Sequence, residues 1–77
     1  MPAYEAYYRQ LEDQGYGYLD NVDSQHSLHD ATWYGCKSYE SNTRYAGEAI
    51  VKSYGYTPAE ASAIMSAAIS NGLCLRT

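Results

Sequence analysis

The sequence predicts an all-α fold, a compact bundle of about four short helices that forms one small helical domain over residues 1–77. Two observations predict it. Apolar residues recur at helical spacing in four segments, and residues that stop and start helices separate those segments. No segment of convincing length alternates apolar and polar residues as a β-strand does. A chain of 77 residues has room for a single domain.

The first helix is expected over residues 2–14. Pro2 suits a first helical position, because its missing N–H would have no partner there, and Gly15 supplies a left-handed stop. The apolar residues at helical spacing are Tyr4, Tyr7, Tyr8 and Leu11. Residues 15–21 are rich in turn formers and predict an ordered loop whose aromatic side chains fold back onto the core.

The second helix is expected from Asp23 or Ser24 to about Glu40. Gly35 in its middle weakens it by about 1 kcal/mol relative to Ala, and the close approach of a neighbouring helix would explain its presence. The inward stripe, with Cys36 beside it, consists of Leu28, Ala31, Thr32, Gly35 and Tyr39.

The third helix is expected from about Thr43 to Tyr54. Residues 41–43 break the chain and offer a fresh N-cap, and Gly55 ends the segment. The residues expected to face inward are Tyr45, Ala46, Ala49 and Ile50.

The start of the fourth helix has the clearest local signal. In Thr57-Pro58-Ala59-Glu60, a capping residue is followed by Pro at the first helical position and Glu at the third, which is a capping box. Asn71 and Gly72 close the helix. Its apolar stripe consists of Ala61, Ile64, Met65, Ala68 and Ile69.

Composition excludes several classes of function. The net charge of -4, with five Lys and Arg, supplies no basic face for nucleic acid. No apolar run approaches the roughly 18 residues of a membrane span. Ten Ala and ten Tyr stand beside ten Val, Ile and Leu in all, and Phe is absent. The core is therefore thin in aliphatic volume, and tyrosine must fill part of it.

Two cysteines, Cys36 and Cys74, lie 38 residues apart (74 − 36). This separation fits neither a CxxC metal site nor a thioredoxin-type motif. An even count permits one disulfide, which would stabilise the fold by about 3–4 kcal/mol through the unfolded state. The alternative is two buried free thiols that behave as small apolar groups.

Three places in the chain resemble the small two-cysteine helical domain of unknown function found in mycobacteria. They are the opening AYYRQLEDQG at residues 6–15, Cys36 late in the second helix, and the last helix from residues 56–61 through 67–69 to Cys74. The resemblance implies an all-helical fold stapled by one disulfide, and it implies no activity. The chain departs from the family in having Leu75 where Pro usually follows the last cysteine, and in being rich in Tyr rather than Ala.

Most members of that family are secreted with a signal peptide, whereas this sequence opens without a basic or an apolar leader region. We expect a secreted or extracytoplasmic protein if a signal peptide has been removed. Otherwise we expect an intracellular, phage-encoded relative in the cytoplasm of its host.

Few residues suggest chemistry. His26 and His29, spaced i, i+3 and flanked by Asp23 and Asp30, are weak candidates for a metal site, and the alternative is an exposed, acid-rich helix start. Serines and Cys36 lie near these histidines, but no GxSxG turn or oxyanion-forming loop accompanies them. We expect no enzyme and no cofactor.

The abundance of tyrosine is the positive signal. Tyr7 and Tyr8, like Trp33 and Tyr34, are neighbours about 100° apart on one helix, so each pair must place a ring away from the apolar stripe. Tyr and Trp are favoured anchors at protein interfaces. The sequence therefore predicts an aromatic patch that binds a protein partner or a second copy of the chain. The alternatives are a core that uses Tyr in place of Phe and Leu, or a metal- or small-ligand-binding protein using His26 and His29.

Overall fold

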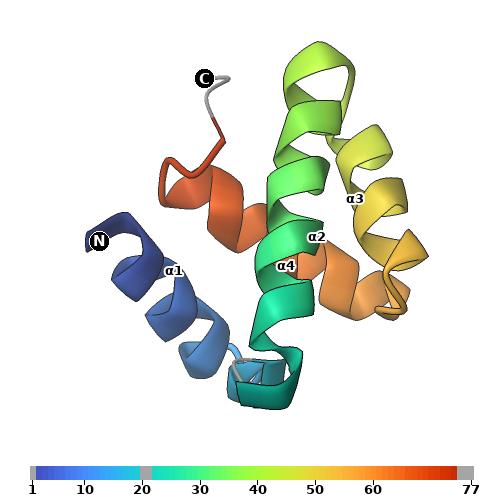
Figure 1. Ribbon diagram of the computed structural model, residues 1–77. Coiled ribbons are helices and arrows are strands. Elements are labelled where there is room, and N and C mark those ends of the chain that lie inside the picture. The colour runs from blue at the N-terminus through green and yellow to red at the C-terminus, as the bar shows by residue number, and fades with distance from the viewer. Residues whose placement is uncertain (1, 20–21, 75–77) are drawn as a thin grey trace.

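The computed structural model describes residues 2–19 and 22–74, and the side chains of residues 4–19 and 28–74. Within these ranges the chain forms four α-helices and one short 3-10 turn, with no strand (Figure 1). Their bounds are α1 Pro2–Asp13, η1 Gly17–Leu19, α2 Val22–Ser41, α3 Arg44–Ser53 and α4 Pro58–Ser70. The expected all-α fold is confirmed, and every helix boundary lies within two residues of its prediction.

Helix α4 is the central element of the bundle. It crosses behind α2 in Figure 1 and contacts α1, α2 and α3. Because it has neighbours on several sides, it buries more than the single stripe expected from the sequence. Its buried residues are Ala61, Ala63, Ile64, Met65, Ala67 and Ala68. Most of these are alanines, whose small side chains let the surrounding helices approach closely.

The signals at the helix ends are confirmed. Gly15 and Gly55 follow α1 and α3 with φ angles of 87° and 101°, which favour glycine. At the start of α4 the capping box is complete. The Thr57 hydroxyl accepts a hydrogen bond from the Glu60 backbone N–H at 3.1 Å, and the Glu60 carboxylate accepts one from the Thr57 N–H at 2.9 Å.

Helices α2 and α3 meet at two glycines. A Cβ atom on Gly35 would lie 2.7 Å from the Val51 side chain, and one on Gly47 would lie 2.8 Å from the Gly35 carbonyl oxygen. Real Cβ atoms essentially never lie this close to other atoms, so a side chain at either position would force the neighbouring atoms to shift. The close approach predicted at Gly35 is confirmed.

The inward face predicted for the third helix is partly wrong. Tyr45 is 75% exposed and Ala49 is exposed, whereas Gly47 and Val51 are buried. Gly47 faces α2, where a Cβ atom on it would lie 2.8 Å from the Gly35 carbonyl oxygen, so the buried face of α3 includes Gly47 and Val51 instead.

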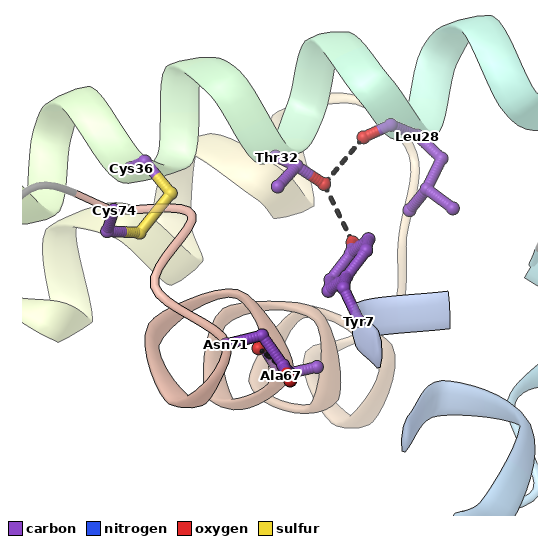
Figure 2. The surroundings of a disulfide bond; sticks show 7 residues. All are labelled: Tyr7, Leu28, Thr32, Cys36, Ala67, Asn71 and Cys74. Carbon is purple, nitrogen blue, oxygen red and sulfur yellow. Dashed lines mark hydrogen bonds between the residues drawn. A yellow bond between two sulfur atoms is a disulfide. The ribbon is translucent and has the colours of Figure 1, made fainter. Parts of the chain in front are cut away.

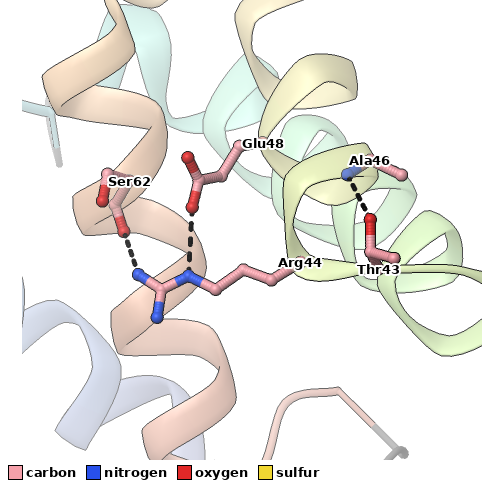
Figure 3. A network of polar contacts seen from close by, with 5 residues as sticks. All are labelled: Thr43, Arg44, Ala46, Glu48 and Ser62. Carbon is pink, nitrogen blue, oxygen red and sulfur yellow. Dashed lines mark hydrogen bonds and ion pairs between the residues drawn. The ribbon is translucent and has the colours of Figure 1, made fainter.

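Polar contacts connect α3 to α4. Figure 3 shows the Arg44 side chain donating hydrogen bonds to the Glu48 carboxylate at 3.0 Å and to the Ser62 carbonyl oxygen at 3.4 Å. The hydroxyl of Thr43, the predicted N-cap, accepts a hydrogen bond from the Ala46 N–H at 3.1 Å. One arginine thus ties the first turn of α3 to the side of α4.

The loop after α1 folds back only in part. Leu19 is buried and Tyr16 packs against the core, as expected. Tyr18 is exposed, and its hydroxyl donates a hydrogen bond to the Glu60 carboxylate at 2.5 Å. This hydrogen bond holds the Tyr18 ring at the start of α4 rather than in the core.

A disulfide joins Cys36 of α2 to Cys74, with an S–S distance of 2.07 Å and a Cα–Cα distance of 4.9 Å (Figure 2). The predicted staple is confirmed. It fastens the segment after α4 to the C-terminal half of α2, the longest helix. In the described part of the chain, no helix is both long and apolar enough to cross a membrane.

Candidate functional site

Tyr7 belongs to the core, so its prediction as a binding residue is wrong. Its side chain is fully buried, and its hydroxyl lies 2.8 Å from the Thr32 Oγ1 atom (Figure 2). Because the Thr32 hydroxyl donates its own proton to the Leu28 carbonyl oxygen at 2.7 Å, Tyr7 must be the donor to Thr32. Burial raises the pKa of Tyr7 far above its ordinary value. The satisfied hydroxyl explains how a tyrosine can replace Phe here.

Tyr8 is half-buried and belongs to a row of rings between α1 and α2. Its ring centroid lies 6.0 Å from that of Tyr4, and the Tyr4 centroid lies 5.6 Å from the His29 ring. The row is built by side chains that α1 and α2 extend toward each other.

Trp33 and Tyr34 are 52% and 50% exposed, as the interface prediction requires of at least one of them. Their rings nevertheless have different neighbours. The Lys37 ammonium lies 5.2 Å from the centroid of the Trp33 ring, whereas Tyr34 stacks on Tyr54, at 6.4 Å between centroids. The four residues from which the patch was predicted therefore do not form one exposed surface, since Tyr7 is buried and Trp33 and Tyr34 contact different side chains.

A pocket of about 160 Å³ lies beside Trp33 and the disulfide. Cys36 is part of its wall. The other residues that line it are Tyr4, Thr32, Trp33, Lys37, Glu40 and Leu73. They come from the first turns of α1, from two turns of α2 and from the segment after α4, so the pocket exists only in the folded chain.

The position of Leu73 follows from local geometry and the disulfide. Gly72 has a left-handed φ of 73°, which turns the chain at the end of α4, and the Leu73 N–H then donates a hydrogen bond to the Ala68 carbonyl oxygen at 2.9 Å. Cys74, the residue after Leu73, is bonded to Cys36 and so fastens the chain to α2. The Leu73 wall is thus fixed on both sides.

The pocket offers apolar walls and a charged edge. A cavity of about 150 Å³ holds a molecule the size of benzene, so one compact side chain or ligand group fits. Lys37 and Glu40 also line a second, shallower depression with Ser41, which extends the site along α2. The arrangement suits binding of a single inserted group with contacts beyond it.

The histidines give no metal site within the described residues. No group of three or more His, Cys, Asp or Glu there could hold a metal ion. His29 is exposed and lies against the Tyr4 ring. The side chain of His26 lies outside the described residues, so the paired-histidine site stays a prediction.

Sequence reasoning singled out Trp33 and Cys36 but did not bring them together, and it gave no site role to the other residues of the pocket. Leu73 directly precedes Cys74, and a residue beside a disulfide-bonded cysteine is expected to have a fixed position. Lys37 stands one helical turn after Trp33, the spacing at which a cation can reach the ring. Tyr4 carried no signal that separated it from the other tyrosines.

No family model, no curated protein and no solved structure matches this chain. The resemblance to the two-cysteine helical family of mycobacteria and its phage-encoded relatives therefore stays a prediction.

Proposed function

We propose that this protein is a small non-enzymatic binding domain whose pocket beside the Cys36–Cys74 disulfide receives one side chain of a protein partner. The observation that carries the proposal is the pocket itself, which combines an apolar interior with a half-exposed Trp33 at its edge. Trp is among the residues that most often dominate binding energy at protein interfaces.

The rigidity of the walls supports this function. Thr32 is buried and hydrogen-bonded, and Cys36 is covalently tied to the segment that carries Leu73. A preformed pocket loses little conformational entropy when a partner binds, and this increases affinity for a given contact area. The core contains little aliphatic volume and would not by itself hold Leu73 firmly in place. The disulfide therefore contributes directly to the shape of the pocket.

The surface around the pocket favours a polypeptide over an isolated small molecule. The shallow depression of Lys37, Glu40 and Ser41 continues from the pocket along α2. A partner segment can place one side chain in the pocket and its neighbours along this depression. The metal-binding alternative through His26 and His29 has no comparable observation in its favour.

The test is capture of partners on immobilised, disulfide-bonded protein, with two matched variants. Trp33→Ala removes the exposed ring at the pocket. Tyr45→Ala removes a more exposed ring on α3 that does not line it. Truncating an anchor residue typically costs about 1–3 kcal/mol of binding free energy. We expect a partner that is retained by wild type and by Tyr45→Ala but lost by Trp33→Ala.

Two results would contradict the proposal. A partner that depends on Tyr45 and not on Trp33 would move the interface to α3. Self-association that is unchanged by Trp33→Ala, measured by sedimentation velocity, would show that a second copy binds elsewhere. Equal melting temperatures of the two variants are the control for folding.

We further propose an oxidising compartment for this protein. Disulfides persist outside the cytoplasm and are reduced inside most cells. The pocket needs the bond, so binding and location are linked. Alkylation of protein in freshly lysed native cells tests this, because thiols that react without prior reduction would place the functional protein in a reducing compartment.

A further inference from the structure

We infer that the group the pocket receives is cationic, an ammonium or guanidinium group, and that Lys37 occupies part of its site until a ligand displaces it. This rests on the proposed function and names the chemical class of its ligand. Three features of the pocket carry the inference: the cation already on Trp33, the composition of the walls and the charge of the chain.

The first feature is the contact between Lys37 and Trp33. The ammonium nitrogen lies 5.2 Å from the ring centroid, within the range of a cation–π interaction. Trp is the aromatic residue that binds cations best. Both residues line the pocket, and Lys37 is exposed, so its flexible side chain can swing into solvent when another cation takes its place.

The second feature is the rest of the pocket lining. Tyr4 contributes another ring, and Glu40 contributes a carboxylate, while Leu73 supplies apolar surface. Aromatic rings with a nearby carboxylate are the usual surroundings of bound quaternary ammonium groups. The pocket volume of about 160 Å³ matches one compact cationic head.

The third feature is long-range. The chain carries nine acidic residues and five basic ones, a net charge of -4. Such a field raises the local concentration of cations and the rate at which a basic partner segment arrives. It disfavours an acidic partner and a second copy of the same chain.

The experiment uses two probes of equal shape. Choline carries a trimethylammonium group, and 3,3-dimethylbutan-1-ol replaces the charged nitrogen by carbon. Trp33 is the only Trp in the sequence, so its indole N–H gives a single NMR signal that reports on the pocket. Both probes are titrated into the disulfide-bonded protein at constant ionic strength, with sodium chloride as the reference salt.

We expect choline to shift the Trp33 signal saturably and to bind about 3 to 30 times more tightly than the neutral alcohol. Lys37→Met should raise the affinity for choline by about two- to fivefold, because it removes the internal competitor. Lys52→Met is the matched control. It removes the same charge from a lysine that lies 6.0 Å from the Tyr45 ring, outside the pocket, and should change the affinity much less.

Each outcome has a defined meaning. If the alcohol binds as tightly as choline, the inference is overturned while the proposed function stands, because the pocket then receives a neutral apolar group. If Lys37→Met lowers the affinity for choline, Lys37 is not a competitor and the inference is also overturned. If neither probe shifts the Trp33 signal, the inference fails. The capture experiment with Trp33→Ala then decides the proposed function separately.

Discussion

The glycine crossing between α2 and α3 predicts that adding one methyl group will destabilise the fold. In Gly47→Ala the new Cβ would lie 2.8 Å from the Gly35 carbonyl oxygen and 2.8 Å from the Met65 methyl carbon. The methionine can move, because its side chain is flexible. The carbonyl oxygen belongs to the backbone of α2, so relief there requires the two helices to separate.

Two opposing terms set the size of the effect. Overpacking a close contact costs about 1–3 kcal/mol. Replacing a helical Gly by Ala recovers about 1 kcal/mol of helix propensity. We expect a net loss of up to about 2 kcal/mol in the free energy of unfolding, which for a domain of this size lowers the melting temperature by up to about 15 °C.

Urea denaturation followed by circular dichroism measures this loss. Ala49→Gly on the exposed side of the same helix is the control for propensity, and it should cost about 1 kcal/mol by that term alone. If Gly47→Ala instead stabilises the protein by about 1 kcal/mol, position 47 is open and the described crossing is wrong.

Three further predictions concern the disulfide and two polar contacts. Replacing Cys36 and Cys74 together by Ala should lower the free energy of unfolding by about 3–4 kcal/mol in urea denaturation, and reductant should destabilise only the wild type. Tyr7→Phe should cost about 0.5–1.5 kcal/mol. Burial raises the pKa of Tyr7, so the stability that Tyr7 contributes is complete below its ordinary pKa of 10.0 and is lost as the pH rises above that value. If ultraviolet absorbance shows that every tyrosine ionises near its ordinary pKa in the folded protein, this prediction is wrong. The pKa of Glu60 is lowered below 4.5 by the hydrogen bond from Tyr18 and by those from the Thr57 backbone and hydroxyl. The stability that the Glu60 carboxylate contributes is therefore present above pH 4.5 and is lost as the pH falls through the pKa that Glu60 has in the folded protein. Tyr18→Phe should raise the pKa of Glu60 in a carboxyl NMR titration, and an unchanged value would show that the bond does not form in solution.

The helix boundaries could be predicted because each depends on local signals. Thr57 and Glu60 satisfy each other across one turn, and Gly15 and Gly55 adopt backbone angles that other residues avoid. Such signals act over a few residues and do not depend on what the helix packs against.

The faces of the helices were harder to predict, because packing partners decide them. Tyr45 was expected inside and lies outside, since the contact of Gly47 with α2 turns α3. The sequence placed at least one ring of the Tyr7–Tyr8 pair at the surface without saying which; Tyr7 is buried, with Thr32 accepting a hydrogen bond from its hydroxyl, and Tyr8 is half-buried. In both cases a contact with another helix decides which side chain is buried, and the pattern of one helix does not contain that contact.

The candidate site shows the same division. At least one of Trp33 and Tyr34 could be placed at the surface because two neighbours about 100° apart cannot both face the apolar stripe of α2. The pocket beside it needs Tyr4 and Leu73, which are 69 residues apart (73 − 4) and meet only in the folded chain. The disulfide was the one sequence feature that connected the distant parts of the site.

The most direct test of the account is photo-crosslinking from the edge of the pocket. A photoreactive benzoyl-phenylalanine placed at Lys37, or at Tyr45 on α3 as the control, is irradiated with the partner isolated by capture on the wild-type protein. The account predicts a crosslink from position 37, none from position 45, and loss of the crosslink when Trp33→Ala is added. A crosslink from position 45 alone, or one from position 37 that survives Trp33→Ala, would contradict the pocket as the site where the partner binds.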